Sequence, residues 1–309
     1  MKYIDWLVQW LENYIHPSVK VRTYERYRLI IEQHIKDKIG SMELNDLSPL
    51  VLQSFITGLL QSGNKKTGTG LSANSVNAII SVIQSSLKTA HLLGLTKKYT
   101  ADKLKRPKLK EKPVECFTLA EQKQIEQAVL NGKKDKLCGI LLCLYSGLRI
   151  GELIALQWSD IDLAKGILTV SKSCHDGKNG LIIDEPKTSS SCRVIPLPKQ
   201  LLPILKSIKK RSDSPFVVSV NGKPVSVRSY QRSFELLLKK LNIPHKGFHS
   251  LRHTFATRAL EFGMDVKTLS EILGHKNPTV TLNRYAHSLM EHKADMMNRL
   301  GKIFTLKSR

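Results

Sequence analysis

Residues 249–258 read HSLRHTFATR and are predicted to be helical. Side chains three residues apart are neighbours on a helical face, so His249 and Arg252 can donate to a common ligand. His249 and His253 could instead form a metal pair, but Ser250 stands where the H-E-x-x-H motif has its acid. No cluster of Asp or Glu nearby supplies a third ligand. We therefore expect no metal here and a structural role for His253.

Downstream, residues 273–287 read LGHKNPTVTLNRYAH. His275 follows a Leu-Gly turn, and Tyr285 lies in the short helix predicted after it. A lone tyrosine is usually a core or interface aromatic. Residues 267–285 also read as a helix-turn-helix, which would serve a non-catalytic DNA-binding regulator. For this stretch alone, both the catalytic and the regulatory interpretation stay open.

Upstream, two further segments carry basic residues in distinctive settings. Residues 146–153 read SGLRIGEL, so Arg149 follows a Ser-Gly break between an apolar helix and the next helix. A guanidinium held there presents a planar fork that suits bidentate binding of a phosphate. The alternative is an arginine that merely caps a surface helix. Residues 185–197 read EPKTSSSCRVIPL and place Lys187 in a hairpin predicted over 181–197.

The residues singled out in these segments include two arginines, two histidines, a lysine and a tyrosine, which are the groups that metal-free phosphoryl transfer requires: Arg149, Arg252, His249, His275, Lys187 and Tyr285. Arginines neutralise charge on the non-bridging oxygens of the transition state, a tyrosine attacks phosphorus, and a cation protonates the leaving oxygen. The chain has no G-x-x-x-x-G-K-[ST] loop for a nucleotide. We expect neither a cofactor nor a metal.

The order of these residues resembles that of the tyrosine recombinases, also called phage-type integrases. The motifs SGLRIGEL, EPKTSSSCRVIPL, HSLRHTFATR and LGHKNPTVTLNRYAH cover about residues 146–287, and their combination is highly specific. The resemblance implies a site-specific DNA recombinase that acts for a mobile element. It would cleave and rejoin DNA through a 3′-phosphotyrosyl intermediate and exchange strands between two duplexes.

The resemblance also implies roles for single residues. Arg149 and Arg252 would hold the scissile phosphate, and Tyr285 would be the nucleophile that releases a 5′-hydroxyl. Because the pKa of a free tyrosine is about 10, attack at neutral pH needs proton removal or a strongly cationic setting. His249 would assist that proton transfer, and His275 would donate a hydrogen bond to the phosphate.

A lysine is expected to act as general acid toward the leaving 5′-oxygen. The Pro-Lys-Thr setting favours Lys187, with Lys172 and Lys178 as rivals. Glu152 matches the supporting acid of the family and is expected to orient the arginine three residues before it, or His249. Its alternative is an ordinary exposed glutamate.

The composition agrees with double-stranded DNA as the partner. The 309 residues include 49 lysines and arginines against 26 aspartates and glutamates, for a formal net charge of +23. Self-repulsion of that size is tolerated mainly where a polyanion relieves it, which argues against an enzyme for cationic substrates. A solvated face is the alternative for any one basic cluster, but we expect these residues to follow the DNA backbone: Lys65, Lys66, Lys103, Lys105, Arg106, Lys108 and Lys110.

The sequence also bears on compartment. No apolar run reaches the roughly 18 residues that a membrane helix needs. The five cysteines include no C-x-x-C pair, so neither a disulfide framework nor a structural zinc site is expected. These features predict a cytoplasmic, nucleoid-associated protein.

Hydrophobic periodicity predicts a mainly α fold with a small antiparallel β-sheet in the C-terminal domain, the α+β class. Residues 1–105 are expected to form a helical core-binding domain that clamps DNA, residues 106–115 a basic linker, and residues 116–309 the catalytic domain with a C-terminal tail helix. Strands are expected at residues 166–171, 181–184 and 193–197.

The resemblance further implies assembly on DNA. The tail after residue 287 is expected to dock on a neighbouring subunit and so to link a homotetramer around two duplexes; packing on its own domain is the alternative. An accessory directionality factor is a possible partner. Because the first amphipathic helix starts almost at Met1, we expect no separate arm-binding domain before it. Besides the regulator, a type IB topoisomerase is the competing function, since it uses the same nucleophile without exchanging DNA partners.

Overall fold

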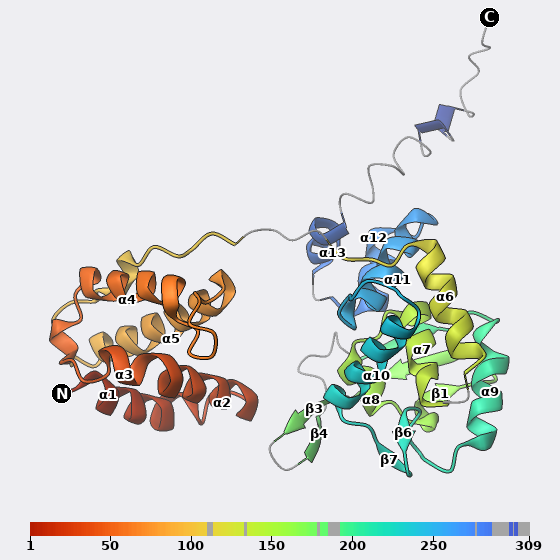
Figure 1. Cartoon of the computed structure of the whole chain (residues 1–309), viewed down its shortest axis with the longest axis horizontal. Helices are drawn as coiled ribbons and strands as arrows, with labels where there is room; N and C mark the ends of the chain where they lie inside the picture. The colour runs from red at the N-terminus through yellow and green to blue at the C-terminus, as the bar shows by residue number, and fades with distance from the viewer. Residues whose placement is uncertain are drawn as a thin grey trace, which may run out of the picture. The chain divides into compact units, whose positions relative to one another are not determined.

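The computed structural model of the chain contains two compact units, Met1–Lys112 and Pro113–Arg309 (Figure 1). Helices dominate both units, and the described strands are short and antiparallel, which confirms the predicted fold class. None of the described helices is long and apolar enough to span a membrane. The structure describes residues 1–109, 114–132, 135–177, 180–184, 192–275, 277–285, 297–298 and 300–301.

The first unit is helical where the apolar spacing predicts it. Two π-helical turns, Leu11–Ile15 and Ile31–Ile35, continue its first and second helices. The predicted cap at Ser48 is present, because its hydroxyl accepts from the Val51 N–H and Pro49 takes the first helical position. The α-helices are α1 (Tyr3–Trp10), α2 (Val21–Ile30), α3 (Lys36–Ile39), α4 (Pro49–Ser62) and α5 (Ala73–Leu92).

Helix α5 anchors the segment predicted to be a linker. Arg106 donates from its guanidinium to the side chains of Ser81 and Gln84 at 3.2 and 2.6 Å, and Leu104 is buried in the core of the first unit. The chain is therefore still attached to α5 at residue 106, where the basic linker is expected to begin. Residues 110–113 lie outside the described part of the chain.

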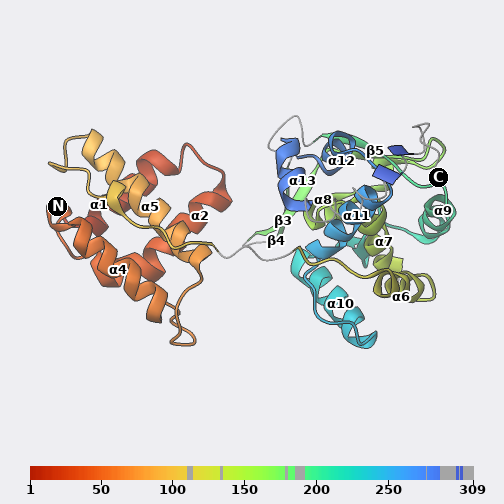
Figure 2. The same cartoon turned by 90° about the horizontal axis from the view of Figure 1, so that it is seen from above.

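Helix α11 runs through the middle of the second unit and packs against α7 and α12 (Figures 1 and 2). Helix α7 is buried because it is apolar on all sides, and α6 begins with the predicted capping box of Thr118 and Glu121. The helices of this unit are α6 (Leu119–Leu130), α7 (Cys138–Ser146), α8 (Ile150–Ala155), α9 (Leu201–Arg211), α10 (Val227–Lys240), α11 (His249–Glu261), α12 (Val266–Leu273) and α13 (Pro278–Tyr285).

The described strands form three small antiparallel sheets instead of the single predicted one. They are ordered β1-β2-β5, β3-β4 and β6-β7. The predicted 181–197 hairpin is wrong, because β4 pairs with β3 and β5 pairs with β2. The sequence of β3 is polar and gives no strand signal, so its pairing with β4 is not predicted. The strands are β1 (Ile161–Asp162), β2 (Ile167–Val170), β3 (Ser173–Gly177), β4 (Gly180–Asp184), β5 (Arg193–Pro196), β6 (Ser219–Val220) and β7 (Lys223–Pro224).

Candidate active site

Arg149 follows a sharp turn between α7 and α8. Gly147 ends α7 in the left-handed region, with φ of +66°. A Cβ at this position would lie 2.6 Å from the Phe255 ring and 2.7 Å from Leu273, so only glycine fits. Leu148 is buried. The backbone that leads into Arg149 is thus held on both sides.

The carboxylate of Glu152 holds Arg149 in place. Its Oε2 accepts from the Arg149 backbone N–H at 2.9 Å, and its Oε1 accepts from Nη1 at 2.8 Å. Arg193, at the start of β5, adds two further bonds from Nη1 and Nη2, at 3.1 and 2.9 Å. Glu152 is 6% exposed and is therefore not the ordinary surface glutamate of the alternative interpretation.

Glu152 stays ionised at neutral pH despite this burial. Burial raises the pKa of its carboxyl group, but the hydrogen bonds and charge of Arg193 and the charge of Arg149 outweigh that effect and lower the pKa to about 2. The site therefore contains a permanent negative charge that is shared by two guanidinium groups.

Arg252 is 2% exposed and lies at the ends of two helices. Its Nη1 donates to the Gly147 carbonyl and its Nη2 to the Leu273 carbonyl, both at 2.7 Å. Burial, and then the charge of Arg149, lower the pKa of Arg252 to about 9, so the group is still cationic at neutral pH. Its Nη2 is also 2.9 Å from His275 Nε2.

His275 links Arg252 to α13. A guanidinium can only donate, so Nε2 of His275 accepts this bond and the ring proton lies on Nδ1. Nδ1 is 2.7 Å from the hydroxyl of Thr281, which is buried and accepts that proton's hydrogen bond. In this arrangement His275 Nε2 is an acceptor, whereas the expected bond to a phosphate requires it to donate.

Tyr285 ends α13 and is 2% exposed. Its hydroxyl is 2.7 Å from Nδ1 of His253, and the His253 ring meets His249 edge-on with centroids 4.5 Å apart. His253 therefore contacts the candidate nucleophile, and its expected structural role stays a prediction. Its position directly after Arg252 on the same helix was the signal in the sequence.

Five of the six predicted catalytic residues lie in the described part of this region, on α8, α11, α12 and α13 or the turns between them. Lys187 and its rival Lys178 lie outside the described residues. The other rival, Lys172, donates to Gln157 and Asp160, which ties it to the loop before β1. Arg193 and Thr281 are site residues that the sequence did not single out, since their roles depend on contacts between distant segments.

The described site carries three guanidinium groups, those of Arg149, Arg193 and Arg252, and one buried carboxylate. Such an excess of fixed positive charge favours a phosphate and its transition state. Across the described ranges, no group of three or more His, Cys, Asp or Glu side chains is placed to hold a metal ion.

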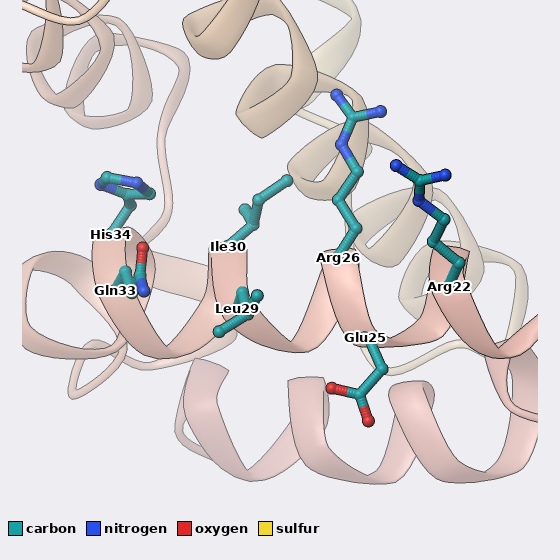
Figure 3. A pocket seen from close by; sticks show the side chains of 7 residues that line it. All are labelled: Arg22, Glu25, Arg26, Leu29, Ile30, Gln33 and His34. Atoms are coloured by element: carbon teal, nitrogen blue, oxygen red, sulfur yellow. The ribbon is translucent and has the colours of Figure 1, made fainter. Parts of the chain in front are cut away.

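The first unit has a basic pocket on α2 (Figure 3). Figure 3 shows Arg22, Arg26 and His34 projecting from one side of the helix and Glu25 from the other. Partial burial, and then the charge of Lys65, lower the pKa of His34. The pocket is lined by Arg22, Glu25, Arg26, Leu29, Ile30, Gln33 and His34.

Of the residues predicted to bind DNA, those in the described part are exposed, although two are also engaged within the protein. Lys65 pairs with Asp37 at 2.9 Å, and Arg106 binds α5. Lys110 lies outside the described residues. The remaining residues that are predicted to bind DNA are also exposed: Lys66, Lys103, Lys105 and Lys108.

Known proteins of the same family share both units. Residues 116–292 match the phage integrase family, and residues 3–60 match its N-terminal SAM-like domain. The chain is 28% identical to a tyrosine recombinase XerC-like protein of Caldanaerobacter subterraneus subsp. tengcongensis, over 97% of this chain and 83% of that protein. Because the first match covers more than half of its length, the chain belongs to the phage integrase family.

Solved structures agree with this assignment. The Tn1549 transposon integrase, in complex with a circular intermediate DNA, superposes with a TM-score of 0.79 at 27% identity, over 97% of this chain and 99% of that one. A lambda integrase tetramer bound to a Holliday junction has a TM-score of 0.68 at 20% identity, over 90% and 79%. The chain is thus a tyrosine recombinase, an enzyme class that cleaves and rejoins DNA.

The buried Glu152 network makes folding stability depend on pH. A pKa lowered from near 4.5 to about 2, at about 1.4 kcal/mol per unit, corresponds to about 3 kcal/mol. That stability is present above pH 4.5 and is lost as the pH falls toward 2. Urea unfolding at pH 7 should show Glu152→Gln less stable by about this amount. The difference should shrink below pH 4.5; a difference that is constant with pH would contradict the ion-pair account.

Proposed function

We propose that the protein is a site-specific recombinase of a mobile element, which exchanges strands between two DNA duplexes through Tyr285. The observation that carries the proposal is the 2.7 Å contact of the Tyr285 hydroxyl with His253, which directly follows Arg252 of the cationic cluster on α11. The DNA-bound transposon integrase of similar fold supports the assignment to a mobile element.

In the proposed reaction, the Tyr285 oxygen attacks phosphorus and the bond to the 5′-oxygen breaks. This forms a 3′-phosphotyrosyl ester, and Lys187 gives its proton to the leaving 5′-oxygen. Arg149 and Arg252 bind the non-bridging oxygens as negative charge develops on them. Attack by a 5′-hydroxyl on the ester reverses the steps, so the phosphodiester energy is conserved and no cofactor is consumed.

His253 is the first acceptor of the Tyr285 proton in this proposal. The 2.7 Å contact lets the hydroxyl donate to Nδ1 of a neutral ring. His249, edge-on to that ring, supports its orientation. When Arg252 turns toward the phosphate, His275 Nε2 loses its donor; the tautomer with the ring proton on Nε2 can then donate to the phosphate as expected, while Nδ1 accepts from the Thr281 hydroxyl.

Replacement of His253 tests the proton transfer. His253→Asn keeps a hydrogen-bonding group near the Nδ1 position but cannot take the proton, so cleavage at pH 7 should slow by about 100-fold or more. A histidine acceptor makes the rate level off above about pH 7, whereas an unassisted tyrosine, with a pKa near 10, keeps gaining rate up to about pH 10. Covalent-adduct formation is measured against pH for both proteins. The exposed His245, changed to Asn, is the matched control; parallel profiles for His253→Asn and wild type would contradict the proposal.

The exposed basic residues of the first unit are proposed to grip the DNA backbone. Lys66, Lys103, Lys105 and Lys108 are exposed, and Arg22 and Arg26 extend the basic surface onto α2. Each phosphate contact releases counterions, so binding measured against salt concentration should weaken steeply.

Assembly as a homotetramer on DNA is part of the proposal. The lambda integrase tetramer on a Holliday junction has the same fold. The tail after residue 287, whose residues lie almost entirely outside the described part, is proposed to link neighbouring subunits. The enzyme would act in the cytoplasm, on the nucleoid, with a directionality factor as a further partner.

A nicked duplex that carries the recombination site tests the reaction itself. The nick lets the 5′-hydroxyl fragment diffuse away, so wild type should accumulate a covalent adduct that resists SDS, and Tyr285→Phe should form none. An adduct with Tyr285→Phe, or no adduct with wild type on a verified site, would contradict the proposal. A regulator would bind the site without cleaving it, and a type IB topoisomerase would cleave it but join no strands between two duplexes.

A further inference from the structure

Arg193 belongs to the cationic cluster, but the proposed reaction gives it no role. It stands at the start of β5, six residues after Lys187 in the sequence, and its side chain is 6% exposed. Strand β5 pairs along its length with β2. A guanidinium so enclosed and so firmly held is poorly placed to receive a phosphate itself.

The Arg193 guanidinium joins two segments of the site. Its Nη1 and Nη2 donate to the two oxygens of Glu152 on α8, at 3.1 and 2.9 Å. Its Nε donates to the Ile272 carbonyl near the end of α12. One side chain therefore fixes β5, α8 and α12 relative to each other.

Arg193 and Arg149 both donate hydrogen bonds to Glu152. The Arg149 side chain is 37% exposed, so a phosphate can reach it. With Arg193 on both carboxylate oxygens, Arg149 contributes only Nη1, and its Nη2 donates to the Gly274 carbonyl at 3.2 Å. Without Arg193, a buried carboxylate would draw both Arg149 nitrogens into a bidentate pair, because that is the strongest geometry open to it.

The turn that presents His275 rests on the same side chain. Gly274 has φ of +63°, and a Cβ there would lie 3.0 Å from Nη1 and 3.3 Å from Cζ of Arg193. The guanidinium therefore packs closely against the backbone of the residue just before His275. Arg193 supports both the arginine and the histidine that are proposed to meet the phosphate.

We infer that Arg193 is a positioning residue for DNA cleavage: it holds Glu152 and the turn at Gly274 so that the Arg149 guanidinium gives only one hydrogen bond to Glu152 and keeps further N–H groups for the scissile phosphate. The inference rests on the proposed function. Partners that orient directly acting groups typically change activity by about 10- to 100-fold when replaced.

The test compares rates of adduct formation at saturating protein on the nicked duplex. Arg193→Lys keeps the charge but loses the fork, and should cleave about 10- to 100-fold more slowly with little change in DNA affinity. Because it acts through Arg149, the double variant with Arg149→Lys should be hardly slower than Arg149→Lys alone. Arg211→Lys is the matched control, since Arg211 makes a similar two-nitrogen pair with Asp135 on the surface; its rate should equal that of wild type.

A second substrate separates positioning from folding. A methylphosphonate at the scissile position has a methyl group in place of one non-bridging oxygen and carries no charge, so an arginine placed to neutralise that charge matters less. The loss for Arg193→Lys should shrink on this duplex together with the loss for Arg149→Lys. Equal losses on both duplexes, multiplied losses in the double variant, wild-type rates for Arg193→Lys, or an unfolded Arg193→Lys protein would each overturn the inference. If wild type forms no adduct, the proposed function itself fails.

Discussion

One buried carboxylate shared by two arginines is the interaction on which the site depends. Three guanidinium groups that lie close together repel one another, and burial alone opposes their charged state. Glu152 offsets that cost, and its pKa of about 2 keeps it ionised wherever the protein is folded and active. The remaining positive charge is what a phosphate diester can neutralise.

Arg252 is stabilised in another way, by helix ends. The carbonyls of Gly147 and Leu273 that accept its protons lie at the C-terminal ends of α7 and α12. Carbonyls there have no partner within their own helix and carry the negative end of the helix dipole, so they favour a cation. Each helix ends at a glycine in the left-handed region, Gly147 or Gly274. Gly147 and Gly274 therefore do more than turn the chain, because they end the two helices whose terminal carbonyls bind Arg252.

The sequence predicted most of this site because its signals are local. The spacing of His249 and Arg252 and the glycines next to Arg149 and His275 follow from helix geometry and backbone sterics. Arg193, 41 residues from Glu152, acts through a tertiary contact that no local pattern reveals. The contact of His253 with Tyr285, 32 residues away, also depends on the fold, although the position of His253 next to Arg252 is visible in the sequence.

The strands predicted at residues 166–171, 181–184 and 193–197 are present as β2, β4 and β5, but their predicted pairing is wrong for the same reason. Strand β3, with the sequence SCHDG, has no apolar alternation, so its pairing with β4 depends on the three-dimensional fold and gives no signal in the sequence. Lys187 lies outside the described residues, and its role as the general acid stays a prediction.

The most direct test of this account is a crystal structure of the DNA-free protein with bound orthovanadate, whose oxygens resemble those of a phosphoryl transition state. The account predicts the anion within hydrogen-bond distance of both Arg149 and Arg252, with all four hydrogen bonds to Glu152 retained. An anion that draws Arg149 away from Glu152, or that binds only elsewhere on the second unit, would contradict it.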